Sequence, residues 1–99
     1  MKSFNERVWS ACKKIPKGKV STYSQIAKAI GNSKSSRAVG NALNKNPFAP
    51  KVPCHRVIKS NGEIGGFASG SSKKISLLKK DGIQIKKEKI DLEKYLYKF

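Results

Sequence analysis

Acidic residues are scarce in this sequence. Six Asp and Glu stand against 22 Lys and Arg among 99 residues, which leaves a formal net charge of +16 at pH 7. So large an excess of one sign destabilises the compact state through self-repulsion, and it usually reflects a polyanionic partner. Nucleic acid is the first candidate for that partner, and an anionic membrane surface is the second.

Metal-binding and membrane-spanning features are also few. The chain has one His and two Cys, which supply neither a metal-ligand cluster nor a disulfide framework. No apolar run approaches the roughly 20 residues of a transmembrane helix, and the N-terminus lacks the apolar core of a signal peptide. We therefore expect no metal, no cofactor, reduced thiols, and a cytoplasmic, nucleoid-associated location without membrane contact.

The length and pattern indicate one domain over residues 1–99, with a core at 4–85 and a tail helix within 86–99. A first helix is expected to end at Pro16 and Gly18, and its apolar face comprises Phe4, Val8, Ala11, Cys12 and Ile15. Cys12 is therefore interpreted as core packing rather than as a reactive thiol. A second helix follows Thr22, which forms a capping box with Gln25, and it stops at Gly31.

A third helix should run from Ser35 or Ser36 to about Leu43 or Asn44. Two short helices joined by a Gly-containing turn are typical of a helix-turn-helix, whose second helix is normally the one laid into DNA. The polar face of the third helix carries Arg37, Gly40, Asn41 and Asn44. A mid-helix Gly costs about 1 kcal/mol relative to Ala, which makes sense if a phosphate backbone or another helix comes close. The alternative is a plain solvated face.

The second half of the chain shows turn chemistry. Pro47, Pro50 and Pro53 forbid helix, and Asn61-Gly62 predicts a hairpin between 56–60 and 63–65, the wing of a winged-helix domain. The loop 65–70 either passes close to a ligand or acts as a hinge. Ser71 or Ser72 should cap a helix over 73–81 that Gly82 closes, and Asp91 should cap a last helix that carries Leu92, Tyr95, Leu96 and Phe99 on one face. The predicted fold class is mainly α with a small β-hairpin, a winged-helix-like helix-turn-helix domain.

The stretch 52–58 contains the most reactive pair of side chains. Cys54 stands beside the single histidine, His55. The thiolate is the nucleophilic form of cysteine, and an adjacent imidazole with surrounding positive charge would generate it near neutral pH. The alternative for Cys54 is a small buried hydrophobe.

Asp81 stands in an unusual position, at the C-terminus of its predicted helix, where the macrodipole disfavours negative charge. Its spacing from Ile75 and Leu78 points it toward the buried side. There it would orient and polarise His55, as the third member of a catalytic triad does. The alternative is a surface carboxylate relieved by Lys79 and Lys80.

Over residues 4–85, five blocks of the sequence resemble the O6-alkylguanine-DNA alkyltransferases, in the C-terminal, DNA-binding and active-site domain of that family. The matching blocks are residues 21–27, 36–42, Asn46-Pro47, 52–58 and Gly65-Gly66-Phe67. The family's N-terminal domain has no counterpart in this sequence. Asp81 stands where the family has Glu, and Ala68 stands where Ser or Gly is usual.

The resemblance implies a methylated-DNA–[protein]-cysteine S-methyltransferase, a DNA repair protein that flips O6-alkylguanine out of the duplex. Cys54 would accept the alkyl group irreversibly, in a single turnover. His55 would be its base, acting through a water molecule, with Asp81 as orienter, and Asn46 would fix the turn at the active site.

The resemblance also implies a partner and a pocket. The partner would be double-stranded DNA, bound through the minor groove by a monomer without sequence preference, as the basic surface allows. Tyr23 would lie against the phosphate of the target nucleotide, Arg37 would enter the duplex, and Ser36, Gly40 and Asn41 would contact DNA. The residues expected to line the guanine pocket are Val52, Pro53, Val57, Phe67, Ala68 and Ser69.

Two other functions remain open at this point. One is a non-catalytic, alkyltransferase-like module that binds the lesion without removing the alkyl group. Proteins of that kind replace the acceptor Cys, whereas Cys54 is present here. The other is a winged-helix transcriptional regulator, which would need neither the Cys54-His55 pair nor Asn46.

Overall fold

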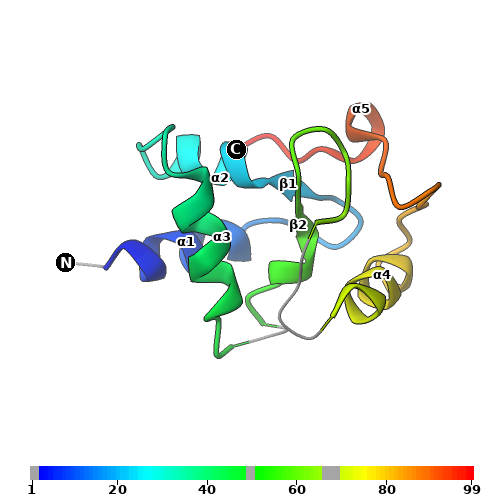
Figure 1. Cartoon of the computed structure of the whole chain (residues 1–99), viewed down its shortest axis with the longest axis horizontal. Coiled ribbons are helices and arrows are strands. Elements are labelled where there is room, and N and C mark those ends of the chain that lie inside the picture. Colours follow the sequence, from blue (N-terminus) through cyan, green and yellow to red (C-terminus); the bar gives the residue numbers. More distant parts are fainter. Residues whose placement is uncertain (1–2, 49–50, 66–69) are drawn as a thin grey trace.

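The computed structural model describes residues 3–48, 51–65 and 70–99. Within them, helices α1 (Phe4–Lys13), α2 (Tyr23–Ala29) and α3 (Ser36–Asn44) pack together on one side of the molecule. On the other side lie α4 (Ser71–Lys80) and the single turn α5 (Leu92–Tyr95) (Figure 1). Between them, the short 3-10 helix η1 (Cys54–Arg56) leads into strand β2 (Val57–Ile58). The prediction of a mainly helical domain is confirmed.

Helix starts follow local side chains only in part. Thr22 caps α2, with its hydroxyl accepting the Gln25 N–H at 3.1 Å, but within the described part of the chain the Gln25 side chain does not complete the predicted capping box. At α3, however, the Ser35 hydroxyl donates to the Asn32 carbonyl at 2.6 Å and caps nothing. The expected Ser cap of α4 is wrong too, because the N-cap is Gly70, whose φ of +95° lies in the region that favours glycine.

The sheet differs from the predicted hairpin. Strand β1 (Ser21–Thr22) pairs in parallel with β2, with Ser21 opposite Val57 and Thr22 opposite Ile58. Of the hairpin only the turn is present, closed by a 2.9 Å bond from the Lys59 N–H to the Glu63 carbonyl. The Asn61-Gly62 pair predicts that the chain reverses its direction at that point. It cannot reveal that β2 pairs with a strand 36 residues earlier in the chain.

The wing pairs with the tail instead. The Ile64 N–H donates to the Glu88 carbonyl at 3.1 Å, and the Ile90 N–H donates to the Gly62 carbonyl at 2.8 Å. A Cβ at Gly62 would lie 2.8 Å from the Ile90 carbonyl oxygen, so only glycine fits there.

Two apolar cores meet at β2. The first joins α1, α2 and α3 with Val52 and Val57, and the second joins the wing, α4 and the tail with Ile58. Because successive strand residues point to opposite faces, Val57 enters the first core and Ile58 the second. The residues just before β2 are thereby held from both sides.

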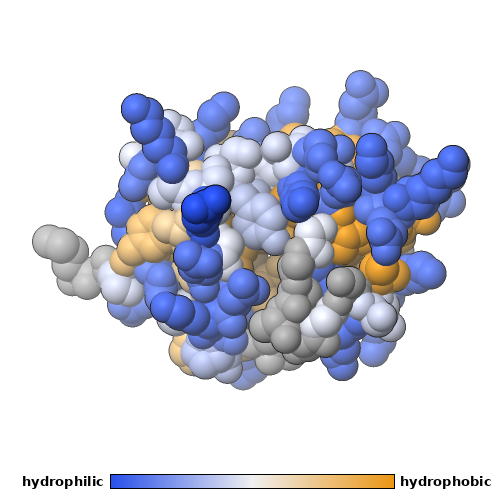
Figure 2. All heavy atoms as spheres, in the orientation of Figure 1, coloured by the Kyte–Doolittle hydropathy of each residue, from blue (hydrophilic) through white to orange (hydrophobic). Residues whose placement is uncertain are grey.

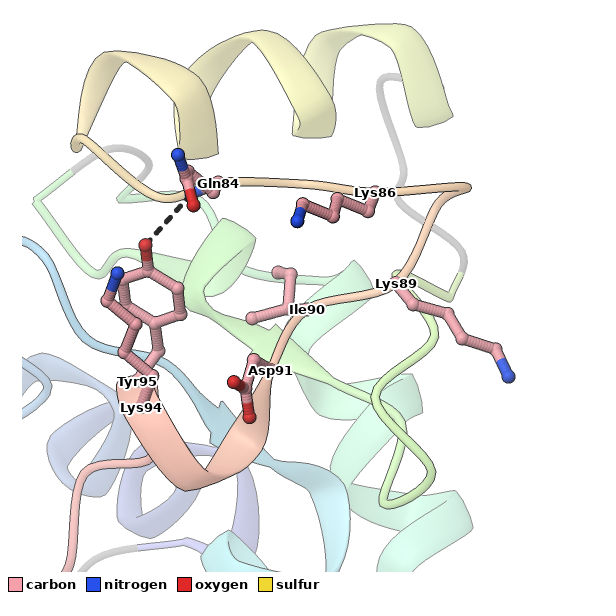
Figure 3. A pocket seen from close by; sticks show the side chains of 7 residues that line it. All are labelled: Gln84, Lys86, Lys89, Ile90, Asp91, Lys94 and Tyr95. Atoms are coloured by element: carbon pink, nitrogen blue, oxygen red, sulfur yellow. Dashed lines mark hydrogen bonds between the residues drawn. The ribbon is translucent and has the colours of Figure 1, made fainter.

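The tail is less helical than predicted. The helix expected to reach Phe99 ends at Tyr95, and the chain then extends so that the Tyr97 N–H donates to the Val20 carbonyl at 2.7 Å. The Tyr95 hydroxyl accepts the Gln84 N–H at 3.2 Å, beside a cavity of about 320 Å³ (Figure 3). In this view the Lys86 side chain lies above Ile90, whereas Lys89 points away from the pocket.

The tail also contains a strained turn. Lys87 and Glu88 have φ values of +51° and +61°, and Lys86 and Lys89 exchange backbone hydrogen bonds of 3.0 and 2.9 Å across them. Two left-handed central residues define a type I′ turn, which prefers Asn-Gly. Each non-glycine residue in that region costs roughly 1–2 kcal/mol.

We predict that the double substitution Lys87→Asn with Glu88→Gly raises the free energy of unfolding by about 1–2 kcal/mol. Urea unfolding of the two proteins measures this difference. As the control, Glu93→Gly places glycine at a helical position of α5 and should lower stability. A double variant no more stable than the parent would show that the turn carries no strain.

Candidate active site

Cys54 lies at the start of η1, half-buried against the first core. Its N–H donates to the Val52 carbonyl at 2.8 Å, and the Arg56 N–H donates to the Pro53 carbonyl at 2.9 Å. These bonds turn the chain tightly around the cysteine. The turn leaves the thiol partly exposed while the residues on both sides of it, Pro53 and His55, are buried.

The Asn46 side chain forms hydrogen bonds with the backbone at two points in the segment that precedes this turn. Its Nδ2 donates to the Val52 carbonyl at 2.8 Å, and its Oδ1 accepts the Phe48 N–H at 2.9 Å. The family resemblance implied that Asn46 lies at this turn, and the structure brings it there.

His55 and Asp81 are brought together, as the helical spacing predicted. His55 is 4% exposed, and its Nε2 lies 2.9 Å from Asp81 Oδ2. Because an ionised carboxylate only accepts hydrogen bonds, Nε2 carries the proton and Nδ1 is left with its lone pair. Among the described residues, no direct hydrogen bond joins Cys54 to His55.

Burial decides the charge of His55. It disfavours the imidazolium and lowers the pKa of His55 below the ordinary value of 6.5, although the hydrogen bond and charge of Asp81 act in the opposite direction. The imidazole is therefore neutral at neutral pH, the form in which it can accept a proton.

Asp81 has a second partner that the sequence did not indicate. Arg56 Nε donates to Asp81 Oδ2 at 2.7 Å, and Arg56 Nη2 approaches Oδ1 at 3.3 Å. Burial acts to raise the pKa of the Asp81 carboxyl, but the hydrogen bonds from Arg56 and His55 outweigh it and hold that pKa below the ordinary value. Asp81 is thus an ionised, shared acceptor at the C-cap of α4.

Lys74 is the functional candidate that sequence reasoning missed. It is 1% exposed, and its Nζ lies 3.5 Å from the Tyr23 hydroxyl and 5.8 Å from the centre of that ring. Burial lowers the pKa of Lys74 to about 8, while the charge of a Cys54 thiolate acts to raise it. Its i, i+4 spacing from Leu78 was the available signal, obscured because lysine is so frequent in this chain.

The predicted pocket residues fall into two groups. Val52, Pro53 and Val57 are buried around the Cys54 turn. Phe67, Ala68 and Ser69 lie outside the described residues, but Gly65 leads into them, and a Cβ there would lie 3.4 Å from the Tyr23 hydroxyl. The Tyr23 hydroxyl therefore lies close to both Gly65 and the Lys74 ammonium.

The polar stripe of α3 is exposed as predicted. Arg37, Asn41 and Asn44 face solvent, and Ser36 and Gly40 are half-buried. A Cβ at Gly40 would meet the Tyr23 ring at 3.8 Å, an ordinary contact, so the approach of α2 does not require glycine there. Figure 2 shows hydrophilic side chains projecting over much of this face of the molecule.

The described part of the chain offers neither a metal site nor a membrane-spanning helix. No group of three His, Cys, Asp or Glu side chains there could hold a metal ion. The longest described helices have 10 residues, and none of them could cross a bilayer.

The site and the fold together define a helix-turn-helix domain with a cysteine beside a carboxylate-bound histidine. Residues 3–83 match the DNA binding domain of the 6-O-methylguanine DNA methyltransferases. The chain belongs to this family.

Known relatives differ in how much of their own length the chain covers. A methylated-DNA–protein-cysteine methyltransferase of Methanosarcina acetivorans is 57% identical over 80% of the chain and 51% of its own length. Mycobacterium tuberculosis OGT, solved in complex with DNA, has a TM-score of 0.79 at 41% identity over 83% of this chain and 50% of its own. The chain thus spans about half the length of such relatives.

S. pombe Atl1 matches the chain over the whole of its own length. Its structure, in complex with damaged DNA containing O6-carboxymethylguanine, has a TM-score of 0.89 at 33% identity, and the match covers 100% of both chains.

The state of His55 predicts how stability depends on pH. Its folded pKa lies below 6.5, so the unfolded chain takes up a proton first as pH falls. The free energy of unfolding should therefore decline below about pH 6.5 and level off once the folded pKa is passed. Asp81, whose folded pKa is below 3.8, loses its contribution only in a lower range.

Urea unfolding between about pH 8 and pH 5 tests this for the parent and for His55→Gln. The parent should lose more stability across the range than the variant, which has no titrating imidazole. Parallel curves for the two proteins would contradict the assignment of a buried neutral His55.

Proposed function

We propose that this chain is a DNA repair protein that holds an O6-alkylguanine outside the duplex and transfers its alkyl group to Cys54 in one irreversible turnover. The observation that carries the proposal is the buried His55–Asp81 pair, bonded at 2.9 Å, next to a half-exposed cysteine in a chain of this family. The proposal assigns these functions to one monomeric domain over residues 1–99, acting in the cytoplasm on the cell's DNA.

The chemistry uses the free nitrogen of His55. With Nε2 committed to Asp81, Nδ1 can take the thiol proton of Cys54 through a water molecule. The Sγ–C bond forms as the C–O6 bond breaks, and the released guanine anion takes up a proton on its ring, which balances the proton that His55 removed from the thiol. The thioether product has no good leaving group, so the cysteine is not regenerated.

Lys74 supports the same step. Its buried ammonium and a Cys54 thiolate attract each other. It also lies at the Tyr23 hydroxyl, so Tyr23 is held by a donor while it rests against the target nucleotide. Asn46, through its two backbone bonds, keeps the turn that presents the thiol.

DNA binding is assigned to α3 and the basic surface. A base inside the stack is out of reach of a side chain, and extruding it costs a few kcal/mol. Arg37, exposed on α3, is a planar and permanently charged group suited to fill the gap. Asn41, Ser36 and Gly40 would lie along the minor groove, and lysines would contact phosphates without sequence preference.

The full-length match to Atl1 supports a second candidate. In that function the chain would bind and mark the extruded lesion without removing the alkyl group. The presence of Cys54 favours transfer over binding alone, and the next experiment separates the two.

Incubation with a duplex that contains O6-methylguanine should add the mass of one methyl group to the peptide carrying Cys54, as read by mass spectrometry. Cys54→Ser should remain unmodified and still bind the duplex. Cys12→Ala is the matched control, since burial raises the pKa of Cys12 to about 12, and it should be methylated like the parent. Tight lesion binding without a mass change would establish the second candidate instead.

Arg37→Ala should slow transfer by about 10- to 100-fold, because the gap left by the extruded base is no longer filled. Single-turnover rates with the same duplex measure this effect. The control Lys86→Ala removes one positive charge from the tail and should change the rate far less. Equal rates for Arg37→Ala and the parent would remove Arg37 from the flipping step.

A further inference from the structure

Arg56 makes a set of contacts that the proposed chemistry has not used. Its Nε and Nη2 reach both oxygens of Asp81, at 2.7 and 3.3 Å, and its Nη1 donates to the Ile15 carbonyl at 2.9 Å. The side chains of Arg56 and Asp81 are 16% and 10% exposed. One guanidinium thus joins η1, the C-cap of α4 and the segment that follows α1.

One oxygen atom of Asp81 accepts two hydrogen bonds, and this arrangement indicates what Arg56 does. Asp81 Oδ2 accepts from both His55 Nε2 and Arg56 Nε. At a helix C-terminus the macrodipole repels a carboxylate, so this acceptor needs a cation nearby. A neutral His55 does not supply that charge, whereas Arg56 does so at every pH of interest.

We propose that Arg56 is a positioning residue for alkyl transfer, which fixes the Asp81 carboxylate against His55 Nε2 and keeps the imidazole uncharged, so that Nδ1 stays free for the thiol proton. This role also compensates for the shorter side chain of Asp81 relative to Glu. The guanidinium holds the Asp81 carboxylate so that Oδ2 lies 2.9 Å from His55 Nε2. The consequence for transfer rests on the proposed function, but the consequence for the charge of His55 does not.

The groups around His55 determine the direction of the effect. Asp81, from α4, attracts a proton to the ring, while Arg56 and Lys74 repel it. Cys54 adjoins it within η1, and the nearby thiol on α1, Cys12, is uncharged because burial raises its pKa to about 12. Removing Arg56 deletes one repelling charge and leaves Asp81 to His55 alone, so the pKa of the imidazole should rise.

A purely structural role for Arg56 is the competing explanation. In that role it would tie the end of α1 to α4, and its loss would lower stability without changing His55. The chain offers a matched control in Arg7, whose guanidinium donates to the Ile30 carbonyl and ties α1 to the end of α2, and which forms no ion pair with a carboxylate among the described residues.

The test is a titration of His55 by NMR, which is unambiguous because the chain has one histidine. In Arg56→Met the midpoint should move to higher pH, and the acidic limb of the single-turnover transfer rate should move by the same amount. Arg56→Lys keeps the charge but lacks the planar fork, so its midpoint should fall between those of Arg56→Met and the parent. Arg7→Met should leave the midpoint unchanged.

An unchanged or lower midpoint in folded Arg56→Met would overturn the proposal. If Arg56→Met does not fold, Arg56→Lys decides, and a midpoint equal to that of the parent would be the contrary result. A parent that transfers no alkyl group would refute the proposed function, while the NMR midpoints would still test the role of Arg56.

Discussion

One carboxylate determines the geometry around Cys54. Asp81 accepts hydrogen bonds from His55 and Arg56, and through Arg56 it is linked to the Ile15 carbonyl. Because water is largely excluded from the Arg56–Asp81 pair, removing one partner leaves the other charge uncompensated and destabilises the fold. The orientation of His55, the position of α4 and the path of the chain after α1 therefore all depend on the same side chain.

Strand β2 provides the complementary constraint. With only two residues, it places Val57 in one core and Ile58 in the other, and it pairs with β1 rather than with the wing. A strand anchored on both faces cannot rotate about its axis. The residues that precede it, Cys54, His55 and Arg56, therefore keep a fixed direction relative to α3, which carries Arg37.

Local patterns in the sequence predicted those structural features that depend on residues close together in the chain. The first three helices, the cap at Thr22 and the turn at Asn61-Gly62 are of this kind, and helical spacing also placed Asp81 on the side that reaches His55. The parallel pairing of β1 with β2, the docking of the tail on the wing and the contacts of Arg56 and Lys74 join distant segments. Arg56 and Lys74 resemble solvated cations in a lysine-rich chain, and only the fold shows that Arg56 pairs with a carboxylate and that Lys74 is buried against a phenol.

The pairing of Tyr95 and Tyr97 with Val20 affects the order in which the domain can form during synthesis. All buried residues of the first core lie at or before Val57, and of the tail Tyr97 packs against them, so most of that half can assemble while the later chain is still being made. The second core contains Ile90 and Tyr95, and contacts so distant in sequence form slowly. On the ribosome, the nascent protein would therefore already possess the helix-turn-helix while its histidine still lacked the carboxylate that orients it.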